Sequence, residues 1–539
     1  MLPAGAALAC GPNNSPGPTE GHPSSITGAI VGAAHEAGHR LRDGDLPAVP
    51  AETREVPVVI VGGGIAGLSA GWTLRRAGFH DFEVLEMEDD PGGNSRWGQN
   101  EVSAYPWAAH YLPVPTPEST GVLALLDEMG LVRDTLDDGT PVFDERHLCH
   151  EPHTRLFHLG RWQQGLYPQA GIRPEEEAEV AAFEAEMTRC AGLRDASGRP
   201  LFAIPVATSG DDGTLRHLDQ ISMAEYLEKR GWTGERLRWY LDYCCRDDYG
   251  ATTRETSAWA GIHYFAARPN LDPEVFTWPE GNGRIVSHLV QKIDSERVRT
   301  GQMVYGITDR EGGVDVDVLD LANDKPYRLR TRRVIFALPR FLAPYLLRNA
   351  DGPYQLPGLE TFTYSPWMVA NITVQRLPDA PSTLLGAEST WDNVFFDSPS
   401  LGYIVSTHQD LRMTSGESVL TYYLPLSDSA PDVARHELLA RSWDDWVALI
   451  LDDMRRAHPG IEALVRHVDV MLLGHAMIRP TPGFMWGRAR ALANESFGAV
   501  SFAHSDMSGL SIFEEAQYWG IVTAQNVLRR LSVEPSTLY

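Results

Sequence analysis

A continuous apolar run, Val56 to Val61, leads directly into a glycine-rich turn and then into residues at helical spacing. An apolar run without polar interruptions is typical of a strand buried on both faces of a sheet. The segment Leu68 to Arg76 has helical periodicity and stops before Gly78, which favours the end of a helix. Phe82 to Leu85 is predicted as a second strand. The succession of strand, helix and strand predicts an α/β fold.

The turn between the first strand and the helix has the glycine spacing of a dinucleotide-binding fingerprint. Gly62 permits the tight turn, Gly64 lets a pyrophosphate approach the backbone, and Gly67 lets the helix pack on the strand. Ala66 belongs to the same turn. Glu86 follows Gly67 by 19 residues, the spacing expected for a carboxylate that accepts ribose hydroxyls. These residues predict a Rossmann-type cofactor site with the phosphates at the helix N-terminus.

Several later segments also have the pattern of regular elements. Runs with strand-like composition lie at 302–307, 333–339, 368–374, 419–423 and 500–506. Helical spacing is found at 174–187, 221–231, 285–290, 431–458 and 511–528. A mixed sheet covered by helices is therefore expected for the part of the chain beyond the cofactor domain.

Composition narrows the classes of partner. The 539 residues carry a formal net charge of −26, which argues against binding to nucleic acid or to anionic lipid. No apolar run reaches the roughly 18 residues that a membrane-spanning helix needs. A small-molecule substrate, possibly a cationic amine, fits an acidic chain better, because long-range attraction favours cations.

The cysteines and the N-terminal stretch give the sequence evidence on the cellular compartment of the protein. The five cysteines form no CxxC pair and no zinc-site spacing, and the adjacent Cys244 and Cys245 are expected as a buried pair on a helix. The stretch Leu2 to Ala9, followed by Cys10, is similar to the end of a secretory signal without its charged start. The alternatives are a periplasmic or exported protein and a cytoplasmic protein with an ordinary N-terminal tail.

A second glycine turn follows Glu86. With Asp90-Pro91-Gly92-Gly93-Asn94-Ser95-Arg96, the chain resembles the flavin-containing amine oxidase superfamily, which includes polyamine oxidases and phytoene-type desaturases. The resemblance implies FAD as the cofactor, with Gly92 and Gly93 near its pyrophosphate. Asn94 stands where the family usually has Arg, and Arg96 follows two residues later.

The resemblance extends to three further segments. Val304, in Gln302 to Ile307, matches the strand whose valine contacts the adenine through its backbone, and Arg333 to Pro339 matches the strand that completes the FAD domain. Val500 to Asp506 resembles the strand before a helix whose N-terminus faces the flavin. Asp506 would then serve the ribityl or pyrophosphate, and Ser511 opens that helix. No cysteine follows at the usual linkage position, so the FAD is expected to be non-covalent.

The family's arrangement implies two discontinuous domains. A Rossmann-type FAD-binding domain is expected from 54–118, 270–345 and 468–535, and an α+β substrate domain with a mixed sheet from 119–269 and 346–467. Residues 1–53 form the N-terminal tail. The only other glycine turn of note, Gly281-Asn282-Gly283, lacks the third glycine and the preceding strand, so it is interpreted as a loop near the flavin and not as a nicotinamide site.

Candidate catalytic residues lie in aromatic and polar loops. His110 could act as an acid or base, and Asp247 or Asp248 could hold a substrate ammonium. Trp278 and Trp486 are candidates to flank the flavin. The alternatives are a structural histidine, an internal Arg–Asp pair, and core packing for each tryptophan.

Lysine is scarce, with Lys229, Lys292 and Lys325 as the whole set. Many family members place a lysine near the flavin, and the corresponding segment, Trp367 to Asn371, has none. This shifts the expectation from an oxidase that uses oxygen towards a dehydrogenase that uses an electron-transfer protein.

The expected function is that of an FAD-dependent oxidoreductase that removes a hydride equivalent from an organic substrate, oxidising a C–N bond of a polyamine-like amine or an amino acid. Two alternatives remain open. One is a desaturase or dehydrogenase acting on C–C bonds of an apolar substrate, which an apolar tunnel in the structure would favour. The other is a flavin-binding module without catalysis.

Overall fold

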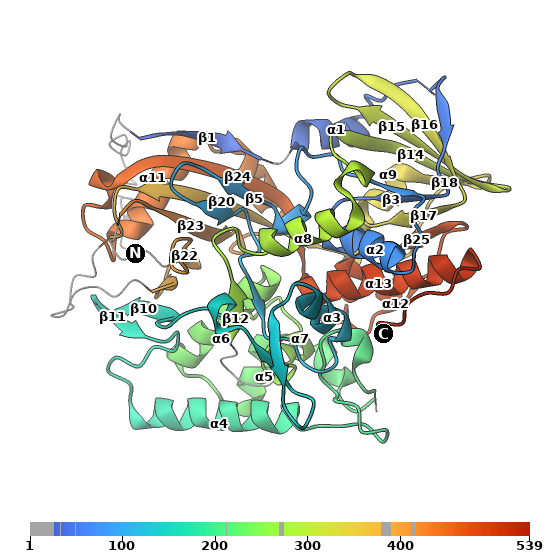
Figure 1. The fold of residues 1–539 in the computed structure, drawn as a ribbon. Coiled ribbons are helices and arrows are strands. Elements are labelled where there is room, and N and C mark those ends of the chain that lie inside the picture. The colour runs from blue at the N-terminus through green and yellow to red at the C-terminus, as the bar shows by residue number, and fades with distance from the viewer. Residues whose placement is uncertain are drawn as a thin grey trace, which may run out of the picture.

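The computed structural model describes residues 26–32, 34–48, 50–211, 213–268, 274–378, 390–410 and 416–539. One part of the molecule is built around a five-stranded parallel sheet and a six-stranded sheet, and the other around a large mixed sheet (Figure 1). The α/β fold class with a Rossmann-type domain is therefore confirmed. The stretch from Leu2 to Cys10 that was compared with an export signal lies outside the described residues.

The five-stranded sheet is parallel throughout and positions the glycine turns. Its strands, in spatial order, are β13 (Val298–Arg299), β4 (Phe82–Leu85), β3 (Val58–Val61), β17 (Arg333–Phe336) and β25 (Val500–Phe502). Three helices cover it: α2 (Ile65–Arg76), α8 (Gly283–Ile293) and α13 (Phe513–Arg530). All residues of β3 are buried, as a continuous apolar run requires. α13 crosses α2 closely, because a Cβ at Gly520 would lie 2.3 Å from the Ala66 carbonyl oxygen.

A six-stranded sheet continues the cofactor-binding part. Its order is β19 (Gly352–Pro353), β18 (Leu347–Asn349), β14 (Gln302–Arg310), β15 (Gly313–Asp320), β16 (Lys325–Thr331) and β2 (Thr53–Glu55). β14 and β15 form a hairpin that turns at residues 311–312, as the glycines there predict. The short helix α9 (Ala343–Leu346) packs on β14.

The large mixed sheet has eight strands. They are β1 (Thr27–Val31), β24 (Val465–Ile478), β20 (Tyr364–Val374), β23 (Ser418–Pro425), β22 (Gly402–Val405), β21 (Asp392–Phe395), β10 (Thr154–His158) and β11 (Arg161–Gln164). Helices outside the parallel-sheet layer are α1 (His35–Asp43), α3 (Thr120–Glu128), α4 (Pro174–Ala191), α5 (Met223–Arg230), α6 (Glu235–Tyr249), α7 (Ala258–Ala266), α10 (Pro431–Ala440), α11 (Trp443–Arg455) and α12 (Arg488–Ala493). The boundary expected at residue 468 falls inside β24.

Short two-stranded pairs connect these layers. They are β5 (Trp97–Gln99) with β6 (Ala104–Pro106), β7 (Tyr111–Pro113) with β12 (Val275–Thr277), and β8 (Val132–Thr135) with β9 (Pro141–Phe143). The pairing of β7 with β12 carries the loop after the second glycine turn across to the large sheet.

One helix prediction is wrong. The segment 431–458 forms two helices, α10 and α11, instead of one. The break lies at Ser442, whose hydroxyl oxygen accepts from the Asp445 amide while the Asp445 carboxylate accepts from the Ser442 amide. This capping box starts a new helix, because it satisfies amides that would otherwise lack partners.

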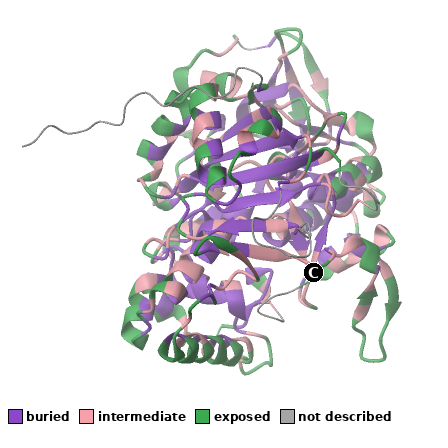
Figure 2. Cartoon of the chain, turned by 90° about the vertical axis from the view of Figure 1, so that its left-hand side faces the viewer, coloured by how far each residue is buried: buried purple, intermediate pink, exposed green. Residues whose placement is uncertain are grey.

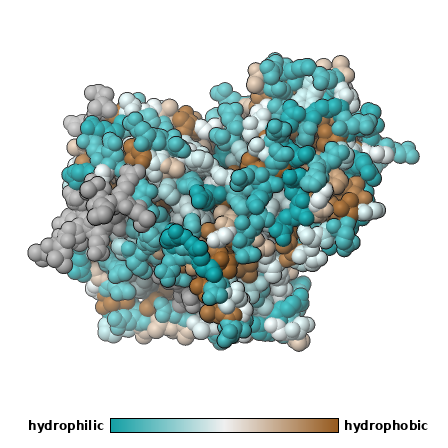
Figure 3. Space-filling model, viewed as in Figure 1, coloured by the Kyte–Doolittle hydropathy of each residue, from teal (hydrophilic) through white to brown (hydrophobic). Residues whose placement is uncertain are grey.

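Burial follows the layers. Strands at the centre of the molecule are buried, and the outer helices and loops carry exposed faces (Figure 2). The face seen in Figure 3 is mostly hydrophilic, with hydrophobic side chains in small groups. Cys244 and Cys245 are both buried on α6, as expected. None of the described helices has the length and hydrophobicity to cross a bilayer.

Candidate cofactor and substrate site

A cavity of about 950 Å³ runs from the glycine turns of the parallel sheet to the large mixed sheet. It gathers nearly all residues expected to bind the cofactor: Gly62, Gly64, Ala66, Glu86, Gly92, Gly93, Asn94, Arg96, Val304, Asp506 and Ser511. Gly67 lies behind this wall, and a Cβ there would be 1.9 Å from the Gly62 carbonyl oxygen. Gly67 therefore permits the close approach of helix and turn, which is the role its spacing predicts.

The two glycine turns face one another and leave backbone open to the cavity. The Gly92 amide donates to the Gly63 carbonyl oxygen at 2.8 Å, and Gly64 forms a parallel bridge with Gly92. A Cβ at Gly64 would meet nothing nearer than the Gly93 Cα, at 3.9 Å. Gly64 caps α2 without a side-chain hydrogen bond. The first amides of α2 thus point into an open cradle suited to a phosphate.

Glu86 is held where a ribose would lie. Its carboxylate accepts the amides of Gly63 at 2.8 Å and of Glu88 at 2.9 Å. Burial raises the pKa of Glu86, and the two amides and the nearby Arg96 oppose this shift. The amides orient the carboxylate, and the carboxylate faces a cavity in which hydroxyl donors would satisfy it.

The second turn is anchored to the large sheet. Asn94 Nδ2 donates to the Ala476 carbonyl oxygen on β24 at 2.6 Å. Arg96 pairs with Glu88 at 3.2 Å and donates to the Gly93 carbonyl oxygen at 3.2 Å. Both side chains line the cavity, but their polar groups already bind the protein. Part of the charge of Arg96 is therefore neutralised before any phosphate arrives.

Asp506 forms a buried acceptor at the start of the C-terminal segment. Its carboxylate accepts the Arg340 amide at 2.7 Å and the Tyr364 hydroxyl. Burial disfavours the charged form, but His504, the Arg340 amide and the Tyr364 hydroxyl outweigh it and hold the pKa of Asp506 below its usual value. A fixed negative group at this place can accept hydrogen bonds from hydroxyls of a bound molecule.

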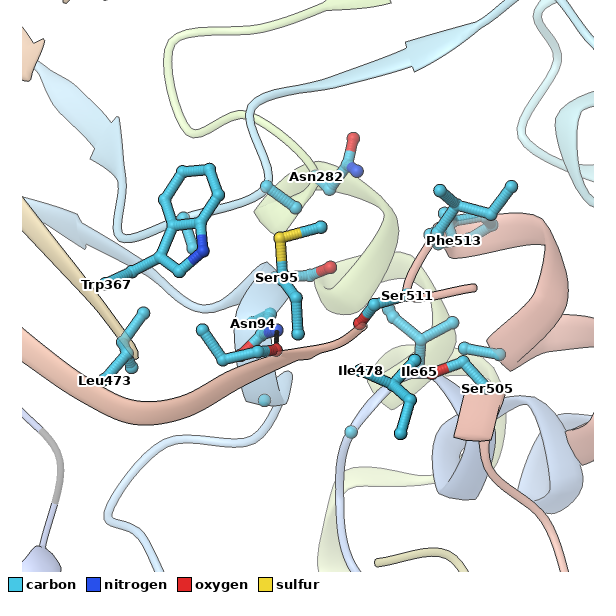
Figure 4. A pocket seen from close by; sticks show the side chains of 18 of the residues that line it. Ile65, Asn94, Ser95, Asn282, Trp367, Leu473, Ile478, Ser505, Ser511 and Phe513 are labelled. Atoms are coloured by element: carbon cyan, nitrogen blue, oxygen red, sulfur yellow. Dashed lines mark hydrogen bonds between the residues drawn. The ribbon is translucent and has the colours of Figure 1, made fainter. Parts of the chain in front are cut away.

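Orphaned polar atoms on the cavity wall also indicate a ligand. The Trp367 Nε1 and the Asn282 Oδ1 are buried without a hydrogen-bond partner in the part of the chain that the structure describes. Both residues line the cavity, as do Asn94, Ser95 and Ser511 (Figure 4). Buried polar atoms are normally satisfied, so these fit a polar, ring-bearing ligand. With the open cradle and Glu86, this end of the cavity is an FAD-type site.

The other end of the cavity is an aromatic chamber. His110 stacks on Tyr423 with ring centroids 4.7 Å apart and lies 5.5 Å from Trp391. Tyr111 meets Trp391 edge to face at 5.9 Å. Tyr243 from α6 lines the same space. Tyr111, Tyr423 and Tyr243 lie on β7, β23 and α6, and His110 and Trp391 directly precede β7 and β21. Together these rings give the chamber walls that exclude water and attract cations.

Two carboxylates that form no ion pair with any described residue, Asp247 and Asp392, face this chamber. Burial, followed by the charge of Asp248, raises the pKa of Asp247 to about 7. Burial, followed by the charge of Asp247, raises the pKa of Asp392 well above its usual value. The Tyr111 hydroxyl donates to Asp247 at 3.3 Å. Two mutually repelling carboxylates in a dry chamber are relieved by a bound cation.

Asp248, predicted as catalytic, has a different environment from its neighbour. It also lines the cavity but pairs with Arg268 at 2.9 Å, and both side chains are buried. The internal Arg–Asp pair weighed from the sequence is what the structure contains. The unpaired carboxylate of the two is Asp247.

His110 is placed in the chamber as expected. Its Nδ1 lies 3.3 Å from the Ala108 carbonyl oxygen, which can only accept a hydrogen bond. Burial lowers the pKa of His110 to about 4, so the ring is neutral at pH 7. With the proton on Nδ1, the Nε2 atom is left as an acceptor.

The two predicted tryptophans lie outside the cavity, which corrects their assignment. Trp278 donates from Nε1 to His147 Nδ1 at 2.9 Å and stacks on Phe276. Trp486 packs edge to face on Trp259 at 5.5 Å and lies beneath Arg216. Both are packing residues, because each has aromatic partners inside its own layer.

Sequence reasoning missed Asp392, Trp391, Tyr423 and Trp367. The sequence shows no motif around Trp391 and Asp392. Strand alternation at Tyr422-Tyr423 places these neighbours on opposite faces: Tyr422 donates to the buried Asp453, and Tyr423 faces the cavity. Alternation was visible in the sequence, but which face meets the cofactor was not.

Comparisons with known proteins agree with this arrangement. A family model described as an NAD(P)-binding Rossmann-like domain matches residues 60–129. A curated relative, the Baeyer-Villiger monooxygenase peniC of Penicillium patulum, is 41% identical over 75 residues, which span 14% of this chain and 11% of that protein. The chain thus matches only a small part of that relative.

Solved structures match over most of the chain. A putrescine oxidase bound to putrescine is 17% identical, with a TM-score of 0.64, and the match covers 89% of this chain and 100% of that one. Cyclohexylamine oxidase from Brevibacterium oxydans is 16% identical, with a TM-score of 0.61 and coverage of 89% and 100%. A fatty acid isomerase from P. acnes is 15% identical, with a TM-score of 0.58 and coverage of 88% and 98%. The chain therefore shares its fold with two amine oxidases and a fatty acid isomerase, and the fold expected from the sequence is confirmed.

Proposed function

We propose that this chain is an FAD-dependent oxidoreductase that oxidises the C–N bond of an amine. When bound, FAD supplies the acceptor for a hydride equivalent from the carbon next to nitrogen. The observation that carries the proposal is the aromatic chamber with Asp247 and Asp392 at the end of the cavity away from the glycine turns. The fold shared with two amine oxidases supports it.

The chamber residues bind and orient the substrate. An ammonium group between Asp247 and Asp392 would be held by charge and by the faces of Trp391 and Tyr423. Oxidation requires the neutral amine, so a proton must leave the ammonium nitrogen. The ionised Asp247 carboxylate accepts that proton, and Tyr111 holds the carboxylate in place.

An apolar substrate fits this chamber poorly. The fatty acid isomerase of similar fold shows that the architecture is not limited to amine oxidases. Against an alkyl chain, however, Asp247 and Asp392 would stay protonated, and their buried polar carboxyl groups would gain no partner from the substrate, which costs free energy. The C–C alternative is therefore the second choice.

We propose an acceptor other than oxygen for the electrons. None of the three lysines lines the cavity: Lys292 pairs with Glu128, Lys325 pairs with Glu52, and Lys229 lies on α5. An electron-transfer protein is favoured, and oxygen is the alternative.

The test is anaerobic titration of the purified yellow protein with monoamines, diamines, amino acids and an unsaturated fatty acid. We expect an amine to bleach the visible flavin absorbance. In Asp247→Asn and Asp392→Asn, amine binding should weaken about 30-fold or more, equivalent to about 2 kcal/mol, with the flavin content unchanged. Asp138→Asn, on an exposed loop, is the matched control. Bleaching by the fatty acid alone, or by no compound, would contradict the proposal. Air or a dye acceptor added afterwards distinguishes oxidase from dehydrogenase.

A further inference from the structure

Three basic side chains from separate elements gather on one wall of the cavity. They are His39 on α1, Arg435 on α10 and His475 on β24, here called the basic wall. In the described part of the chain, none of the three forms an ion pair with a carboxylate. In a protein of net charge −26, three basic groups without acidic partners need an explanation.

The basic wall is a compact cluster. The His475 ring stacks on Phe341 at 4.4 Å. Arg435 reaches the same strand, since a Cβ at Gly474 would lie 3.8 Å from its Cδ, and its Nη1 donates to the Tyr364 carbonyl oxygen at 3.3 Å. Burial, followed by the charges of Arg435 and His39, lowers the pKa of His475 to about 4. At this pKa the His475 ring is neutral at pH 7, and an anion bound beside it would favour its protonated form.

The wall adjoins the cradle at the start of α2. Asn94 of the second glycine turn donates to the carbonyl oxygen of Ala476, the residue after His475. Arg96 of the same turn contacts the Met471 sulfur on β24. The phosphates of a dinucleotide seated on the α2 amides would therefore lie beside the wall.

His39 reaches this place through an N-terminal strap, defined as β1 and α1. β1 pairs in parallel with β24, the strand that carries His475, over residues 27–31. α1 packs on β14 and α9 of the cofactor-binding part (Figure 1). Between them, the Ala34 amide donates to both carboxylate oxygens of Glu88 at 3.0 Å, and Glu88 pairs with Arg96. The strap joins the two halves of the molecule across the cavity.

We propose that the basic wall binds the pyrophosphate of the dinucleotide, and that the N-terminal strap closes over the cofactor after it has entered. This inference rests on the proposed FAD cofactor but not on the amine substrate. Arg435 supplies positive charge that Asn94 lacks and that Arg96 shares with Glu88, and the ring N–H groups of His39 and His475 supply further donors. Cofactor release then requires the strap to detach.

The first test uses the apoprotein with two probes, ADP and riboflavin. ADP carries the phosphates, and riboflavin carries the ring without them. In Arg435→Gln and His39→Gln, we expect ADP affinity to fall about tenfold or more and riboflavin affinity to stay within twofold of the unmodified protein. His436→Gln, exposed on α10 beside Arg435, is the matched control. Unchanged ADP affinity would overturn the assignment, and equal losses for both probes would indicate a structural role instead.

The second test measures FAD release by recovery of free-flavin fluorescence. In Gly28→Val the new side chain would collide with the backbone, since a Cβ there lies 1.8 Å from the Val468 carbonyl oxygen. We expect release at least tenfold faster, with Ile30→Val on the same strand as the control. Ala34→Pro removes only the amide that Glu88 binds, keeps a compatible φ of −74°, and should also speed release. Release rates equal to the control in both variants would overturn the closing role, whether or not any amine reduces the flavin.

Discussion

The dinucleotide end of the cavity is formed largely by backbone from residues 62–67 and 86–96, whereas the chamber is formed by side chains from α6, β7, β21 and β23. In the proposed function, phosphates and ribose hydroxyls would be bound by amides and by one carboxylate, Glu86, whose positions follow from a local strand–turn–helix. An ammonium would be bound by Asp247 and Asp392, which are 145 positions apart in the chain. The first end depends on local geometry and the second on the packing of distant segments.

This difference also separates the kinds of substitution that each end tolerates. At Gly62 and Gly67, an added methyl group would lie 2.7 Å and 1.9 Å from a backbone carbonyl oxygen. In the chamber, a neutral side chain of the same shape leaves the fold intact and changes only charge. Variants at the first end should therefore affect folding and cofactor together, and variants at the second should change substrate binding without loss of the fold or of the cofactor.

The largest effect is expected for Gly67→Ala. Its Cβ would lie 1.9 Å from the Gly62 carbonyl oxygen, so α2 and the turn must separate. We expect loss of bound flavin and destabilisation by about 3 kcal/mol or more. Flavin absorbance per protein and thermal unfolding measure this. Gly416→Ala, where a Cβ would meet nothing within 4 Å, is the control. A Gly67→Ala protein that is yellow and stable would contradict the role given to backbone contacts at the dinucleotide end.

An intermediate effect is expected for Asp247→Asn on the way the stability of the protein depends on pH. Burial raises the pKa of Asp247 from 3.8 to about 7 in the folded protein, so the folded state binds this proton more tightly than the unfolded state. The stability linked to the proton is complete below pH 4 and is lost as pH rises through about 7. Asp247→Asn should remove this loss and raise the Tm of the substrate-free protein by a few degrees at pH 8, but not at pH 4.

The comparison at pH 8 and pH 4 needs Asp137→Asn as its reference, because that carboxylate is exposed. Amine binding to the unmodified protein should strengthen as pH rises through about 7, when the Asp247 carboxylate ionises. Equal Tm differences at both pH values would show that Asp247 is not a buried charge.

The smallest effect is expected for Trp486→Phe. Trp486 packs on Trp259 outside the cavity, so a smaller ring should cost about 1 kcal/mol of stability and leave flavin content and amine reduction unchanged. Trp367→Phe, which removes an unpartnered indole N–H from the cavity wall, should alter the flavin spectrum or its affinity. If Trp486→Phe changed amine reduction and Trp367→Phe did not, the substrate site would have to include Trp486.

Prediction from the sequence succeeded where the residues that form an element or a binding turn lie close together in the chain. The strand over Phe82–Leu85 was predicted with the bounds that the structure shows, and the fingerprint placed Gly62, Gly64 and Glu86 at the cavity. It failed where a local signal interrupts periodicity, as at Ser442, whose capping box splits one predicted helix into two.

For the catalytic candidates, residue type misled. Trp278 and Trp486 have the ring chemistry of a flavin neighbour, but their positions are set by Phe276 and Trp259 in the core. Aromatic residues serve packing and binding equally well. The neighbouring pair Asp247 and Asp248 shows the same limit, because Arg268 neutralises the second and not the first.

The sequence by itself determined the Rossmann-type fold and the dinucleotide end, because a tight turn, a phosphate cradle and a ribose acceptor need fixed residues at short spacing. Tertiary structure alone decided the chamber and the basic wall. Asp247 meets Asp392, and His39 meets Arg435 and His475, only after sheets and helices from distant segments have packed. Burial shifts the pKa values of these side chains, and burial depends on the whole fold.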